Sequence, residues 1–185
     1  MDIVEFFQLS AGKWFSQRTN HQFAVQKQEC GKSDLIIEAI DRLSPSVMQL
    51  CEQAKVDPKS ALCATQITWT GTIEQTTKKQ TGVTLLVAIA NSDNPQTGQL
   101  LKSAESSGGQ PRMGRYIMSR NDELTLIIED NTTYSEERLW FESPNVRLRH
   151  SILKQPNGFS MASFCSEIRM GVTKPPQSAE SGSAA

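Results

Sequence analysis

The chain has 185 residues and a formal net charge of −1, and a chain of this length predicts a single domain. The balanced charge argues against nucleic-acid binding and against attraction to an anionic membrane surface. No apolar run reaches the roughly 18 residues that a membrane span needs, and the N-terminus is acidic where a signal peptide would be basic. We therefore expect a soluble, cytoplasmic protein.

Two short helices are predicted. The first follows Asp2, which forms a capping box with Glu5 ahead of apolar residues at helical spacing. The second starts with Ser44 as its cap and Pro45 in its first turn, and Asp57-Pro58 follows and stops the chain from continuing as helix. Its apolar stripe consists of Val47, Leu50, Cys51 and Ala54.

The rest of the chain has the pattern of strands separated by turns. The connections carry Gly, Pro, Asn and Asp, Gly31-Lys32 among them, and several are short enough to predict antiparallel hairpins. Residues 174–185 are polar and rich in Ser and Ala, so we expect a disordered tail after one domain at 1–173. The candidate strands are 13–26, 33–41, 61–75, 82–91, 98–104, 112–119, 123–129, 133–142, 145–154 and 159–171.

About ten meandering strands with two short helices predict an all-β, up-and-down antiparallel barrel, which removes its sheet edges by closing. Gly12-x-Trp14 matches the G-x-W signature of the first strand of lipocalin-like barrels, where the Trp plugs one end beside an N-terminal helix. The alternative fold is a β-sandwich.

The four cysteines show no C-x-x-C pairing, which argues against a structural zinc site, and no metal is expected. A disulfide framework is not expected either. Three of the four lie in apolar segments, and we interpret them as small buried thiols. The cysteines are Cys30, Cys51, Cys63 and Cys165.

Arginines inside strands mark the candidate site. Arg147 and Arg149 are two residues apart in WFESPNVRLRHS (140–151), so in a strand both side chains point to the same face. Arg18 lies in the first strand, on a face that it shares with Trp14. Such arginines face either solvent or an acidic ligand inside a barrel, and strand spacing alone does not decide between the two.

Aromatic and acidic residues accompany these arginines. Trp69 lies on a mostly apolar strand face and is expected to point inward, as a flat wall for a conjugated ligand. Glu136 and Trp140 share one face of their strand and Glu137 lies on the other, and the pattern does not show which face is inner. Glu167, if inward, requires a cation or an N–H donor, the alternative being a surface pair with an arginine.

Arginines, one or two carboxylates and flat aromatic walls inside a small barrel suit a large flat ligand with carboxylate tails and central N–H groups. A linear tetrapyrrole fits this description. A fatty acid would use an arginine for its headgroup but has no use for a buried glutamate.

Four ordered motifs between about residue 5 and residue 170 resemble the CpcS/CpeS type of phycobiliprotein chromophore lyase; they are LSAGKWFSQRT, SEERLWF, SPNVRLRHS and GFSMASFCSEIR. The resemblance implies a ten-stranded lipocalin-like or fatty-acid-binding-protein-like barrel. It also implies an enzyme that attaches a bilin, phycocyanobilin or phycoerythrobilin, to a cysteine of a phycobiliprotein subunit, with the bilin as substrate and no permanent cofactor.

The resemblance further implies partners and a location. The partners are apo-subunits of phycocyanin, allophycocyanin or phycoerythrin type, and dimerisation with a second copy or with a related lyase is plausible for the family. The location is the cytoplasm of a cyanobacterial-type cell or the plastid stroma. The alternatives are a carrier of fatty acids and a bilin chaperone without catalytic attachment.

Matching text assigns the catalytic roles to Arg18, Arg149 and Glu167. In the expected mechanism the arginines hold the propionates, Glu167 binds the pyrrole nitrogens, and a cysteine thiolate of the partner adds to the ethylidene carbon. Asn20 stands where relatives often have the first of two histidines, which leaves His21 as the candidate. The predicted bilin contacts are Arg18, His21, Trp69, Glu136, Glu137, Trp140, Arg147 and Arg149.

Overall fold

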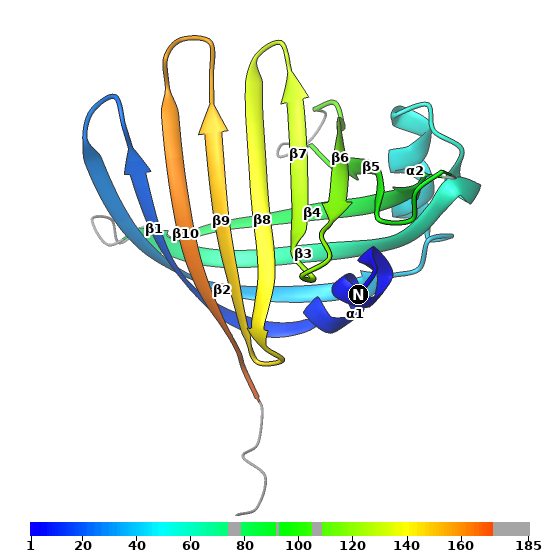
Figure 1. Ribbon diagram of the computed structural model, residues 1–185, viewed down its shortest axis with the longest axis horizontal. Coiled ribbons are helices and arrows are strands. Elements are labelled where there is room, and N and C mark those ends of the chain that lie inside the picture. Colours follow the sequence, from blue (N-terminus) through cyan, green and yellow to red (C-terminus); the bar gives the residue numbers. More distant parts are fainter. Residues whose placement is uncertain (74–78, 92, 105–108, 172–185) are drawn as a thin grey trace, which may run out of the picture.

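The computed structural model describes residues 1–73, 79–91, 93–104 and 109–171. Ten strands form a closed barrel in sequence order, with the last strand paired to the first (Figure 1). The predicted up-and-down barrel is therefore confirmed, and the alternative β-sandwich is not formed. None of the described helices is both long and apolar enough to span a membrane. The tail predicted at 174–185 lies outside the described residues.

All ten predicted strands and both predicted helices are present. The first helix keeps its predicted capping box between Asp2 and Glu5, whereas the hydroxyl of Ser44 makes no capping hydrogen bond to the second helix. In chain order the elements are α1 (Ile3–Ser10), β1 (Gly12–Gln22), β2 (Lys27–Ile40), α2 (Pro45–Gln53), η1 (Pro58–Ser60), β3 (Ala61–Ile73), β4 (Gln80–Ala90), β5 (Thr97–Lys102), β6 (Arg112–Met118), β7 (Leu124–Asp130), β8 (Thr133–Ser143), β9 (Val146–Lys154) and β10 (Ser160–Arg169).

The turn predicted at Gly31-Lys32 is wrong, because both residues lie inside β2. The β1–β2 turn comes earlier, at 23–26, where Gln26 adopts a positive φ of 50°. Gly31 is instead a point of close approach: a Cβ there would lie 2.9 Å from the backbone oxygen of Thr72. The glycine therefore reflects crowding inside the sheet and not a change of chain direction.

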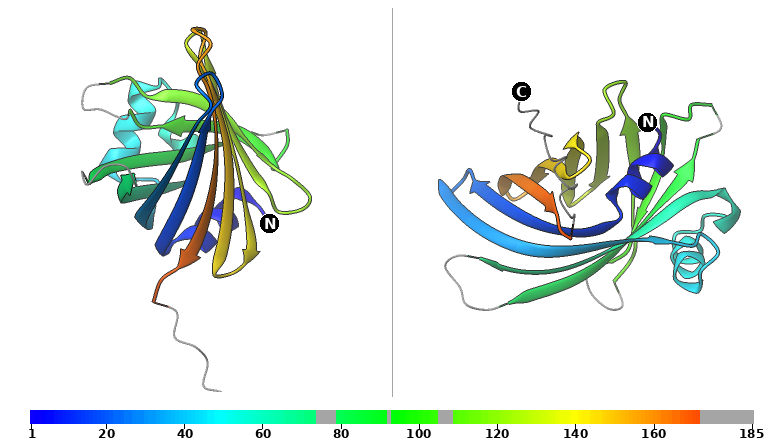
Figure 2. Two further views of the ribbon diagram at one scale, coloured as in Figure 1. Left: turned by 90° about the vertical axis from the view of Figure 1, so that its left-hand side faces the viewer. Right: turned by 90° about the horizontal axis from the view of Figure 1, so that it is seen from below.

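Helix α1 closes one end of the barrel (Figure 2). Ile3, Phe6 and Phe7 are buried against inward side chains of β4 to β8, such as Leu100 and Leu124. The helix is short, so this packing, and not helix propensity, accounts for most of its stability.

Trp14 is the plug that the G-x-W signature predicted. It is fully buried, and its indole N–H donates to the backbone oxygen of Ser10 at 2.8 Å. The guanidinium of Arg169 stacks over the indole at 4.2 Å from the ring centroid and donates to the backbone oxygens of Leu9 and Ala11. These contacts tie the end of α1 to both β1 and β10.

Helix α2 packs on the outside of the barrel (Figure 2). Its buried residues, Val47 and Leu50 among them, contact a cluster that includes Leu85 and Val87 of β4. The neighbouring Leu86 points into the barrel and packs with α1. Strand β4 is apolar on both faces because each face is covered, which is the pattern of a strand buried on two sides.

Candidate functional site

Three neighbouring strands, β1, β10 and β9, carry polar side chains on the inner wall of the barrel. Successive rows along an antiparallel strand face are two residues, or about 6.7 Å, apart. The pairing of β1, β10 and β9 sets three such rows, counted from the end at α1: Ser16, Glu167 and Arg147; then Arg18, Cys165 and Arg149; then Asn20, Ser163 and Ser151. The first two rows place three arginines and a glutamate side by side.

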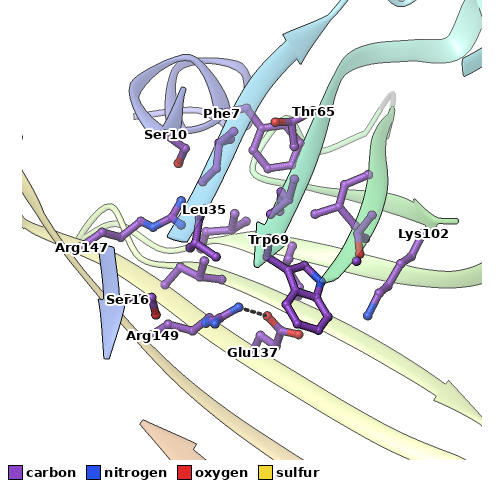
Figure 3. Close-up of a pocket in the computed structure, with 18 of the residues that line it drawn as sticks. Phe7, Ser10, Ser16, Leu35, Thr65, Trp69, Lys102, Glu137, Arg147 and Arg149 are labelled. Carbon is purple, nitrogen blue, oxygen red and sulfur yellow. Dashed lines mark ion pairs between the residues drawn. The ribbon is translucent and has the colours of Figure 1, made fainter. Parts of the chain in front are cut away.

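The barrel encloses a cavity of about 450 Å³, within the usual range for small-molecule sites. Its end at α1 is apolar and includes Phe6 and Phe7. Among the described residues, four cationic side chains and one carboxylate line the cavity. This excess of positive charge favours an anionic ligand. These charged residues are Arg18, Lys102, Arg147, Arg149 and Glu137; Figure 3 labels all of them except Arg18.

Glu167 is buried completely and is neutralised by two arginines. Its Oε2 accepts from Arg147 at 2.6 Å, and its Oε1 lies 3.5 Å from Arg149 Nη2. The Arg147 side chain is also almost fully buried and lies 5.2 Å from the centroid of the Trp14 ring. Buried charges need such pairing, because their loss of hydration is not otherwise compensated.

The pKa values of the two arginines reflect this pairing. Burial lowers the pKa of Arg147, and the carboxylate of Glu167 opposes the shift. Burial acts in the same direction on Arg149, but Glu167, the thiol of Cys165 and Glu137 outweigh it and raise its pKa. A guanidinium does not lose its proton in proteins, so Arg147 and Arg149 are both cations.

Arg18 differs from the other two arginines. Within the described part of the chain it has no carboxylate partner, whereas Arg147 and Arg149 both pair with Glu167. Its Nε is buried without a hydrogen bond, as is that of Arg149. It faces Arg149 across Cys165 in the same row of the wall. Arg18 is thus a cation on the cavity wall that can accept an anionic group from a ligand.

One aromatic residue, Trp69 of β3, lies on the part of the cavity wall that β3 and β4 form. Trp69 lines the cavity, as predicted, and its indole lies across Gly82 of β4 (Figure 3). A Cβ at Gly82 would lie 2.5 Å from the indole Nε1, so only glycine leaves room for this ring position. The indole therefore offers a face on which a conjugated ligand can stack.

The structure places five of the predicted contact residues on the cavity wall and three outside it. His21 is exposed on the outer face of β1. Glu136 and Trp140 lie on the outer face of β8, where Glu136 bonds to Tyr134 and Arg138. The five that line the cavity are Arg18, Trp69, Glu137, Arg147 and Arg149.

Other wall residues were missed from the sequence. Ser10 follows Phe6 by four residues, so it continues the apolar face of α1, and a hydroxyl at that position was a usable signal. Lys102 shares an inner face of β5 with Leu100, which the strand pattern could also have shown. Gly82 could not be identified from the sequence, because its role depends on the indole of Trp69, which lies against it in the fold.

Comparisons with known proteins agree with this geometry. The model of the CpeS-like protein family matches residues 2–170. A chromophore lyase CpcS/CpeS of Thermosynechococcus vestitus is 51% identical over 96% of this chain and 98% of the relative. A phycocyanobilin lyase subunit CpcS of a Picosynechococcus species is 33% identical over 91% of this chain and 88% of the relative.

A solved structure has the same fold. The S-type phycobiliprotein lyase CPES from Guillardia theta superposes with a TM-score of 0.83 at 28% identity, covering 94% of this chain and 95% of that one. The resemblance that the four sequence motifs indicated is thereby confirmed. The chain belongs to the CpeS-like protein family.

Proposed function

We propose that this protein is a bilin lyase, which holds a linear tetrapyrrole in its barrel and attaches it through a thioether to a cysteine of a phycobiliprotein subunit. The observation that carries the proposal is the cavity wall, where three arginines face a flat indole. Relatives named chromophore lyase and phycocyanobilin lyase subunit support it. The partners are then the free bilin and apo-subunits of phycocyanin, allophycocyanin or phycoerythrin type.

The arginines act as carboxylate binders. Arg18 has a buried donor without a partner, and Arg149 keeps part of its side chain at the cavity while pairing with Glu137 and Glu167. Guanidinium groups bind carboxylates through two parallel hydrogen bonds. We assign the two propionates of the bilin to these two arginines, which lie in one row of the wall.

The two glutamates have different roles. Glu167 is buried behind Arg147 and does not line the cavity, so its role is to neutralise and position the arginines. Glu137 lines the cavity with its carboxylate 3.7 Å from Arg149 Nη1. The sequence analysis assigned binding of the pyrrole N–H groups to Glu167. We assign it instead to Glu137, whose carboxylate lines the cavity and favours the protonated form of these groups.

The chemical step is an addition. The cysteine thiolate of the acceptor subunit forms the new C–S bond at the ethylidene carbon of a terminal ring. The electron pair of the ethylidene double bond moves into the conjugated system of the tetrapyrrole, which takes up one proton, equal to the one that the thiol lost. Nothing leaves and no oxidant is needed. The barrel contributes by holding the pigment in one conformation with the reacting carbon presented to the partner.

A carrier of fatty acids on the same barrel is the alternative. It would use one arginine for its headgroup, but it has no second carboxylate for the other arginine and no N–H group for Glu137. A bilin chaperone without catalysis would bind pigment but would not speed its attachment. Mixing protein, phycocyanobilin and apo-subunit in a single turnover separates both alternatives from a lyase.

The Arg149→Ala variant is expected to attach the pigment about 10-fold more slowly, because a charge-assisted hydrogen bond to a propionate is lost. Visible absorbance and fluorescence of the acceptor subunit report the rate. Arg138→Ala is the matched control, since Arg138 carries the same charge on the outer face of β8. Equal rates for Arg149→Ala and the unmodified protein would show that Arg149 does not hold the pigment.

The thiols of this chain are expected not to take part in the reaction. Burial raises the pKa of Cys63 to about 12, so its thiol is protonated under assay conditions, and Cys51 and Cys165 are buried. Cys30, on the outer face of β2 beside Thr19, is the thiol that iodoacetamide should modify first. Cys30→Ser is therefore expected to attach pigment at an unchanged rate, and loss of attachment would mean that the chain itself carries the pigment through a thioether.

Localisation follows from this role. The lyase would act where phycobiliprotein subunits are made, in the cytoplasm of a cyanobacterial-type cell or in the plastid stroma. Dimerisation, with a second copy or with a related lyase, stays a prediction.

A further inference from the structure

Ser10, the last residue of α1, carries a hydroxyl that has no hydrogen-bond partner in the described part of the chain. The residue is only 3% exposed and lines the cavity, and Figure 3 shows it between α1 and Arg147. Leaving a buried hydroxyl unpaired costs free energy, and buried polar groups generally have a partner. A partner for this hydroxyl has to come from within the cavity.

The contacts around Ser10 fix its position. Its own backbone oxygen accepts from the indole of Trp14 at 2.8 Å. The backbone oxygens on either side, of Leu9 and Ala11, accept from Arg169, which itself stacks over Trp14. Three consecutive backbone oxygens are therefore held, and they fix the backbone that carries the hydroxyl beside the cavity.

Ser10 lies beyond the arginines, toward the closed end. Trp14, which binds the backbone of Ser10, precedes Arg18 by four residues on β1, or about 13 Å along the strand. Phe6 and Phe7 line the cavity at this end, and the cation in the row nearest to α1, Arg147, is paired with Glu167. A ligand whose carboxylates meet Arg18 and Arg149 therefore reaches Ser10 with an uncharged end.

We infer that the hydroxyl of Ser10 binds the lactam of the terminal ring that enters the barrel, and so sets how deeply the pigment is inserted. The inference rests on the proposed function. A lactam presents a carbonyl acceptor and an N–H donor on one edge, and a hydroxyl can donate to the first or accept from the second. The methyl end of a fatty acid would leave the hydroxyl unpaired. With one terminal ring held at α1, the opposite terminal ring faces the cysteine of the partner.

Variants of two buried serines separate a ligand contact from a structural one. Ser10→Ala is expected to bind phycocyanobilin about 3- to 10-fold more weakly, with no loss of thermal stability in the absence of pigment, since the hydroxyl has no partner in the protein. Ser10→Thr keeps the hydroxyl and should keep the affinity. Ser163→Ala is the matched control: its hydroxyl donates to Asn20 at 2.7 Å, so it should lower the melting temperature and leave the affinity unchanged.

The pigment can be varied to identify the group that Ser10 binds. Two phycocyanobilin derivatives, each blocked as a lactim ether at one terminal ring, are titrated against the unmodified protein and Ser10→Ala. We expect the derivative blocked at the entering ring to bind the unmodified protein more weakly than phycocyanobilin does. Ser10→Ala is expected to bind this derivative and phycocyanobilin with equal affinity.

Three outcomes decide against these assignments. Equal affinity of Ser10→Ala and the unmodified protein for phycocyanobilin overturns the inference. The inference is also overturned if esterifying the propionates, and not blocking a lactam, removes the difference in affinity between the unmodified protein and Ser10→Ala. The hydroxyl would then bind a carboxylate of the pigment. In both cases attachment to the apo-subunit can continue and the proposed function stands. If the unmodified protein binds no phycocyanobilin, the proposed function itself fails.

Discussion

Replacing Glu167 by glutamine is expected to lower the free energy of unfolding by about 3–5 kcal/mol, the usual cost of leaving a buried charge without its partner. Glu167 is completely buried, and Arg147 beside it is almost completely buried. The amide keeps the shape and one hydrogen bond of the carboxylate but removes its charge. Arg147 would then be a cation without a counter-ion, 5.2 Å from the indole of Trp14.

Urea unfolding followed by tryptophan fluorescence measures this cost. Arg138→Ala is the control, because it breaks an exposed ion pair with Glu136 at 2.8 Å and should cost at most about 1 kcal/mol. The double variant Arg147→Met, Glu167→Leu removes both charges together and is expected to recover much of the lost stability. A loss below about 1 kcal/mol for Glu167→Gln would mean that the pair is hydrated and not buried.

The barrel could be predicted from the sequence because its evidence is local. Turn residues at short intervals between alternating strands indicate hairpins. A meander of ten antiparallel strands, in which α2 and η1 join β2 to β3, removes its sheet edges by closing into a barrel. The same local evidence predicted a turn at Gly31, which was wrong. A glycine is needed there because the backbone of Thr72, 41 residues later in the sequence, lies close to it on the neighbouring strand.

The site could be predicted only in part, since alternation shows which residues share a face but not which face is inner. Strand β8 carries aromatic and acidic residues on both faces, so Glu136 and Trp140 could not be separated from Glu137 by pattern. Glu167 was expected to need a cation, but the register of β9 and β10 decides that the cation is Arg147. Such pairings depend on strand register, which no single strand encodes.

Replacing Arg18 by methionine is expected to weaken pigment binding about 10- to 100-fold, the range for losing one or two charge-assisted hydrogen bonds. Stability without pigment should not fall, because Arg18 has no carboxylate partner among the described residues and its Nε is buried unpaired. Methionine keeps most of the volume and removes the charge. This combination of weaker binding and undiminished stability is the opposite of the result expected for Glu167→Gln.

The dimethyl ester of phycocyanobilin tests whether Arg18 meets a propionate. The ester removes the negative charges of the pigment, so it should bind the unmodified protein more weakly than the free acid does. If Arg18 holds one propionate, the same esterification must cost less in Arg18→Met, since one charge pair is already absent, and the difference between the two losses is the coupling of Arg18 to that carboxylate. Equal losses in both proteins would place the propionates elsewhere, and Arg149 beside Glu137 would then be the first cation to test.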